Sequence, residues 1–175
     1  MSEADLGRLL VLLARDGWSC QELRPKDEIV WWKLSHDFPR SRRRIEVLAA
    51  TASGSVLFQL ALGLRPTGGC RAALESFLLR LNGRIRLARF SIDRSGQVLL
   101  ESELLVASVS APLLRDHLDA LRATFAHYHR EIELLAKDRA LAEIWHRCHA
   151  GEMEEEPDVD ILSAPEEQGA ARQPA

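Results

Sequence analysis

Residues 86–104 read "RLARFSIDRSGQVLLESEL", and this stretch decides the fold of the chain. Apolar and polar residues alternate on both sides of Asp93-Arg94-Ser95-Gly96, which is typical of two antiparallel strands joined by a tight turn. One face of this hairpin is apolar and is expected to face a core: Ala88, Phe90, Ile92, Val98, Leu100 and Leu104. The other face is polar and is expected to point outward: Arg89, Ser91, Glu101 and Glu103.

A long amphipathic helix is predicted directly after the hairpin. Ser110 is expected to be its N-cap, with Pro112 tolerated in the first turn. Its apolar residues recur at steps of three and four: Leu114, Leu118, Leu121, Phe125, Tyr128, Ile132 and Leu135. The spacing then shifts, so we expect a bend or a new start near Asp138, followed by a helical stretch that carries Leu141, Trp145 and Cys148.

The residues before the hairpin complete an α+β pattern. A helix is predicted over about 3–16, ended by Gly17, and a second helix contains Leu74 and Leu81. Four short strand-like runs lie between these helices: "WSCQEL", "EIVWWKL", "RIEVLAA" and "SVLFQLAL". The order α-β-β-β-β-α-β-β-α predicts an α+β domain with helices on one side of a twisted antiparallel sheet.

Composition indicates one soluble globular domain followed by an acidic tail. The chain has 175 residues, of which 46% are hydrophobic and 28% charged, and its net charge is −3. Residues 151–175 contain eight acidic residues and one arginine, a charge of −7, which leaves +4 for residues 1–150. The tail has too few apolar residues to offset the entropy of ordering, so we expect it to be disordered. A charge of +4 is weak support for nucleic-acid binding, and we expect none.

Cysteine content and the N-terminal sequence favour a cytoplasmic protein. Cys20, Cys70 and Cys148 are odd in number and widely spaced, which suits a reducing compartment better than a disulfide framework. The uninterrupted apolar run 9–14 is too short to cross a bilayer, so no membrane association is expected.

No set of residues in the sequence makes a convincing catalytic or metal site. His127 and His129 are two apart on a helix, about 200° around its axis, and therefore cannot share a metal ion. His146 and His149 face the same way with Cys148 beside them, but zinc would need further ligands that the sequence does not place there. We therefore expect no catalysis, no metal and no cofactor.

Two features suggest a surface for a partner protein. If Trp32 and Leu34 face the core, then alternation turns outward an unusually apolar set: Ile29, Trp31, Leu48 and Leu57. A covering helix or a register shifted by one residue would also account for this set. The basic run 40–44, which includes Arg42 and Arg43, is either a solvated loop or a contact for an acidic partner segment or for the acidic tail.

The chain resembles the YbjN family and the type III secretion chaperone-like fold to which that family belongs. The resemblance rests on "LLRLNGRIRLARFSIDRSGQVLLESELL" (78–105), on the helix that follows, and on "DGW" at 16–18. It implies a domain over residues 1–136, with a helical extension over 137–150 and the acidic tail over 151–175. It also implies a non-enzymatic homodimer that binds a client polypeptide segment; a regulatory adaptor that reads an acidic partner through the basic run is the alternative.

The resemblance also implies where two copies would meet. Secretion chaperones pair through the second helix and the next strand, which correspond here to Leu74, Phe77, Leu78, Leu81, Ile85 and Leu87. Leu79 widens the apolar arc of this helix beyond what one sheet requires. A charge at this interface, as in Leu78→Glu, is expected to give a monomer or an aggregate.

Overall fold

The computed structural model describes residues 3–23, 31–38, 43–52 and 54–149. It has four α-helices, two short 3-10 helices and six strands in these residues. In chain order they are α1 (Glu3–Leu12), η1 (Leu13–Asp16), β1 (Trp18–Leu23), β2 (Trp31–Phe38), β3 (Arg43–Ala52), β4 (Ser55–Ala61), α2 (Arg71–Asn82), β5 (Arg89–Ile92), β6 (Val98–Leu105), η2 (Val106–Ser108), α3 (Ala111–Lys137) and α4 (Arg139–His149).

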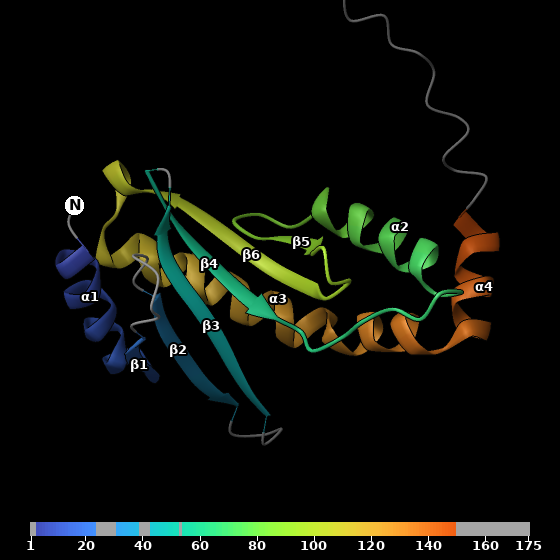
Figure 1. Ribbon diagram of the computed structural model, residues 1–175, viewed down its shortest axis with the longest axis horizontal. Helices are drawn as coiled ribbons and strands as arrows, with labels where there is room; N and C mark the ends of the chain where they lie inside the picture. The colour runs from blue at the N-terminus through green and yellow to red at the C-terminus, as the bar shows by residue number, and fades with distance from the viewer. Residues whose placement is uncertain (1–2, 24–30, 39–42, 53, 150–175) are drawn as a thin grey trace, which may run out of the picture.

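The six strands form one antiparallel sheet in the order β1-β2-β3-β4-β6-β5. Figure 1 shows α1 and α3 behind one face of this sheet, whereas α2 and α4 lie together beyond β5. No described helix lies over the opposite face, which we call the outer face. The predicted α+β fold with an antiparallel sheet is therefore confirmed; α1 and α3 lie on one side of the sheet as predicted, whereas α2 and α4 lie beyond its edge.

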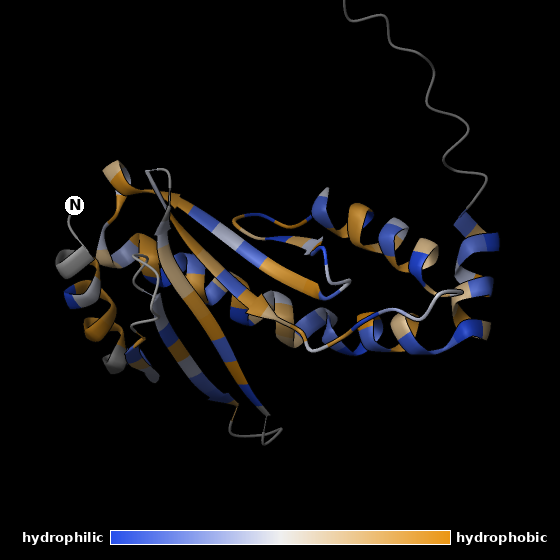
Figure 2. Ribbon diagram, in the orientation of Figure 1, coloured by the Kyte–Doolittle hydropathy of each residue, from blue (hydrophilic) through white to orange (hydrophobic). Residues whose placement is uncertain are grey.

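Alternation along the strands separates the core from the outer face. Trp32, Leu34, Phe58 and Leu100 are buried on the side of the helices, as the sequence pattern predicts. They pack with buried leucines of α1 and α3 in one continuous core: Leu6, Leu10, Leu114, Leu118 and Leu121. Figure 2 shows hydrophobic and hydrophilic residues alternating along the strands.

The predicted helix ends are confirmed where the caps are described. The Ser110 side chain accepts a hydrogen bond from the backbone N–H of Leu113, and Pro112 lies in the first turn of α3. Gly17 follows the N-terminal helical segment with a φ of +83°, which a residue with a side chain rarely adopts. Asp138 separates α3 from α4, so the helix restarts at the place where the apolar spacing shifts.

One predicted strand is shorter than expected. β5 begins at Arg89, so the expectation of a strand from Ile85 is wrong. Residues 83–88 form a loop in which Leu87 has a φ of +62°, a left-handed conformation incompatible with a strand. The side chain of Asn82 bonds both backbone groups of Phe90, at 2.7 Å to its N–H and 2.9 Å to its carbonyl. This amide takes the place of a neighbouring strand along β5.

Candidate functional site

The outer face brings together three of the four apolar residues that the sequence predicts there. Trp31 and Leu57 both lie opposite Ala50 of β3, and Leu48 lies opposite Lys33 and Gln59 in the next row. Leu48 is 38% exposed, and the side chains of Trp31 and Leu57 are half-buried. The fourth, Ile29, lies outside the described residues.

An open groove of about 820 Å³ runs over this face. It includes Leu48 of the predicted set and adds two half-buried leucines that the sequence analysis missed, Leu23 and Leu99. The sequence pattern does not indicate these two leucines. Leu23 is the last residue of a strand that is mostly polar, and Leu99 lies on the outward side of the hairpin, where the neighbouring residues are polar. The remaining lining residues are Lys33, Arg44, Ile45, Glu46, Gln59, Leu60, Ala61, Leu62, Phe125, His129 and Glu133.

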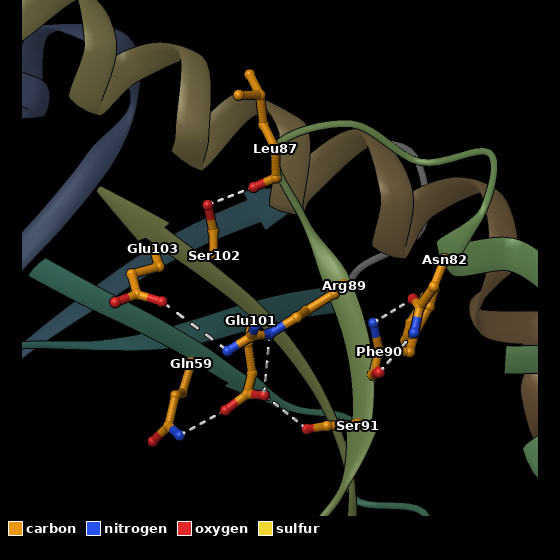
Figure 3. A network of polar contacts seen from close by, with 9 residues as sticks. All are labelled: Gln59, Asn82, Leu87, Arg89, Phe90, Ser91, Glu101, Ser102 and Glu103. Atoms are coloured by element: carbon orange, nitrogen blue, oxygen red, sulfur yellow. Dashed lines mark hydrogen bonds and ion pairs between the residues drawn. The ribbon is translucent and has the colours of Figure 1, made fainter. Parts of the chain in front are cut away.

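A polar network occupies the outer face on the β6 side of this groove, as Figure 3 shows. Glu101 accepts hydrogen bonds from Gln59 Nε2 at 2.8 Å and from Ser91 Oγ at 2.7 Å. Arg89 lies 3.9 Å from Glu101 and 4.0 Å from Glu103. The network ties β4, β6 and β5 together, and Arg89 balances one of its two carboxylate charges, so this part of the face presents a polar border.

Ion pairs also join four of the described charged side chains on β2 and β3. Lys33 lies 2.6 Å from Glu46, and Arg44 lies 3.3 Å from Asp37. Of the predicted basic partner contacts, Arg42 lies outside the described residues, and the side chain of Arg43 is not described. Arg44, the described arginine of this run, is exposed and pairs within its own sheet.

The histidines and cysteines of the described residues do not come together in one site. His149 Nδ1 is 2.9 Å from the carbonyl of Trp145, and the two rings stack with centroids 3.8 Å apart. His146 and Cys148 are exposed, and burial raises the pKa of the Cys20 thiol, which disfavours the reactive thiolate. Across the described ranges, no three His, Cys, Asp or Glu side chains are placed to hold a metal ion.

A buried histidine holds the loop before β5. Ser102 Oγ donates to the carbonyl of Leu87 and lies 2.6 Å from His117 Nδ1. Because a hydroxyl donates only one hydrogen, the Nδ1–H of His117 donates to Ser102. His117 is buried at 5% exposure, so this chain of bonds fixes the left-handed Leu87 from inside the core.

Stability should fall in mild acid because of His117. Burial lowers its pKa from the usual 6.5, against the opposing influence of the Asp116 carboxylate. A lowered pKa means that the folded chain binds the proton less readily than the unfolded chain. The stability that the neutral His117 side chain contributes to the folded chain is therefore complete above about pH 6.5. It is lost as the pH falls through the folded-state pKa of His117.

The variant His117→Asn isolates the pH dependence that comes from His117. Its side-chain amide keeps a hydrogen-bond donor close to the position of Nδ1, and it does not titrate. Urea denaturation is measured between about pH 7.5 and pH 5. The midpoint of the native protein is expected to fall further than that of the variant. Parallel curves for the two proteins would contradict the assignment.

The residues expected at a dimer interface divide into two groups. Leu74, Phe77, Leu78 and Leu81 are buried within the chain itself, so they offer little surface to a second copy. Phe77 is covered by Trp145 of α4, with ring centroids 5.0 Å apart. Ile85 is half-buried, while Leu87 is 53% exposed and Leu79 is 68% exposed. Leu79 and Leu87 are therefore the exposed apolar residues of this region.

Comparison with solved structures shows that the fold is known. A chain in the crystal structure of the ExsC–ExsE complex is 21% identical, with a TM-score of 0.51 over 79% of this chain and 99% of that chain. An uncharacterized protein from Methanothermobacter thermautotrophicus is 12% identical, with a TM-score of 0.50 over 78% and 99%. A chain of the HopA1–SchA chaperone–effector complex has 12% identity and a TM-score of 0.47 over 74% and 98%.

Sequence comparison identifies the family. No curated protein matches the chain. No helix in the described part of the molecule is long and apolar enough to span a membrane. The family described as "Putative bacterial sensory transduction regulator", YbjN, matches residues 5–134, which include every described strand and nearly all of α3. The chain therefore belongs to the YbjN family.

Proposed function

We propose that this chain is a non-enzymatic, cytoplasmic binding domain that holds an apolar or extended segment of a client or regulatory protein on its outer face. The observation that carries the proposal is the groove over this face. Leu48 is exposed there, Leu23 and Leu99 are half-buried, and no described helix covers them. An apolar surface of this kind, bordered by fixed polar groups, is typical of a protein-binding site.

The comparisons support a partner protein in two ways. The ExsC–ExsE structure, which shares the fold, is a complex of two proteins. The family description names a regulator, and regulators act through partners. We assign binding to residues 1–136 and treat α4 and residues 151–175 as additions to that domain.

We also propose that the chain forms a homodimer, in which Leu79 and Leu87 of one copy contact the second copy. Both side chains are more than half exposed, and they flank the end of α2 and the loop after it. Two-fold pairing would bury this apolar surface against itself.

The binding proposal is tested with Leu48→Arg. A guanidinium placed in the groove would be desolvated on binding, so partner affinity is expected to fall at least about tenfold, or about 1.4 kcal/mol. The measurement is affinity capture from cells of the source organism with quantitative mass spectrometry, followed by calorimetry with the captured partner. Leu12→Arg is the matched control, because Leu12 is 48% exposed on α1, across the sheet from the groove. Equal capture by both variants would contradict the proposal.

A further inference from the structure

β3 and β4 pair along only part of their lengths. Their register runs from Ala52–Ser55 to Val47–Leu60 and ends there. β3 continues through Glu46, Ile45 and Arg44, which pair with β2 on one side and have no described partner strand on the other. Figure 1 shows the two strands diverging at this end, and the groove is lined here by Ile45 and Glu46 on one side and by Ala61 and Leu62 on the other, so this part of the groove is a cleft within the sheet.

The other wall of this β3–β4 cleft is the chain that follows β4. The backbone N–H of Leu62 donates to the carbonyl of Val98 at 3.0 Å, and the N–H of Val98 donates to the carbonyl of Leu64 at 2.9 Å. Residues 62–64 therefore follow β6 and leave β3. Backbone groups of alternate residues in a strand point to the same neighbour, so both walls direct N–H and C=O groups into the cleft.

The cleft has an apolar floor and lies within the groove. Leu48, Ala61 and Leu99 line it from the outer face, and Ile45, Leu62 and Phe125 line it more deeply. These deeper side chains are buried, and Phe125 belongs to α3, so α3 forms part of the floor of the cleft.

The charges around the cleft do not favour an ionic ligand. Lys33 pairs with Glu46, Arg44 pairs with Asp37, and Glu133 lies 2.7 Å from Lys137. An anion or a cation would have to break one of these pairs. The unpaired strand edges instead match the backbone of an extended polypeptide, which offers donors and acceptors in the same alternation.

We infer that the β3–β4 cleft takes one extended segment of a partner protein, which pairs with the edge of β3 at Arg44–Glu46. The segment inserts apolar side chains at alternate positions, and about four residues, some 13 Å, fill the free edge. The inference rests on the proposed protein-binding function and specifies how the partner's backbone is held.

The test uses the full chain and a phage-displayed library of random linear peptides, from which the tightest binder is synthesised. Backbone amide exchange is followed by NMR with and without this peptide. Protection is expected to rise at least about tenfold at alternate amides within 44–46 and 61–64, because only paired amides exchange slowly. N-methylation of the peptide amides that face β3 should weaken binding at least about tenfold, while methylation one residue along should not.

A variant whose side chain fills the cleft provides a second test of peptide binding. Ala61→Trp is expected to block the peptide, whereas Ala107→Trp, at an exposed site in η2 at the other end of β6, should leave binding unchanged. A peptide that is lost with Leu48→Arg but protects no amide in 44–46 would overturn the cleft and leave the proposed function standing. Selection of no binding peptide would overturn both.

The same NMR spectra show whether the cleft is instead occupied by a second copy of the chain or by a segment of the same chain. Protection at 44–46 without peptide that grows with protein concentration would show a second copy in the cleft. Protection without peptide that is independent of concentration would show a segment of the chain itself. Either result would overturn the assignment to a partner protein.

Discussion

Leu78→Glu is expected to unfold the domain, with a loss of about 3–5 kcal/mol in the free energy of unfolding. Leu78 is 4% exposed and belongs to the continuous core, so a carboxylate there would be buried without a partner. The measurement is urea denaturation followed by circular dichroism. Leu79→Glu is the matched control, because the neighbouring side chain is 68% exposed. Measured at a protein concentration below that at which the native chain dimerises, it should change the free energy of unfolding by less than about 0.5 kcal/mol, because no contact between copies is then lost.

The same pair of variants separates folding from dimerisation. Leu78→Glu cannot report on a dimer, because its effect on the core would dominate any effect on association. Leu79→Glu should remain folded and should shift light scattering from the mass of two chains to that of one. A native chain that is already monomeric at micromolar concentration, or a dimeric Leu79→Glu, would refute the proposed interface.

Asn82→Ala is expected to lower the free energy of unfolding by about 1–3 kcal/mol. The substitution removes both hydrogen bonds to Phe90 and leaves its backbone N–H and carbonyl unpaired next to a buried ring. Urea denaturation measures the loss, and amide exchange should become faster at Phe90. Arg84→Ala, at an exposed site in the following loop, is the control and should be close to neutral. Unchanged exchange at Phe90 would show that the side-chain bonds do not hold β5.

Local patterns in the sequence were sufficient to predict most of the fold. The hairpin, the Ser110 cap and the break at Asp138 depend on residues close together in the chain, and the structure has all three. Alternation also placed Trp32 and Leu34 inward and Leu48 outward, because a side chain in a strand has only two directions available.

The differences between the sequence predictions and the structure depend on tertiary contacts. A wide apolar arc on α2 indicates that something covers it, but the pattern does not say what. In the structure α4 covers part of it, through Trp145 on Phe77, so a second copy is not needed there. The left-handed Leu87 is likewise held by Ser102, fifteen residues away, and nothing in the local sequence signals it.

The groove was only partly predictable for a related reason. Leu48 and Leu57 could be assigned to a face, but the place where β3 and β4 separate depends on where the chain turns to follow β6. That turn rests on backbone bonds between residues 62–64 and Val98, which leave no mark in hydrophobic periodicity.

The Asn82 amide has a consequence for how copies of this chain could aggregate. β1 and β5 are the two outermost described strands of the sheet, and a sheet with two free margins can add copies in both directions without limit. Asn82 occupies the outward backbone groups of Phe90, one of the four residues of β5, so another strand cannot pair along the full length of that margin without breaking these bonds. Growth through the margins is then favoured at β1, where one β1 pairs with another in a two-fold contact that closes on itself. A pair of copies joined through β1 has no free β1 margin left, so growth into a fibre would have to break the Asn82 bonds at β5.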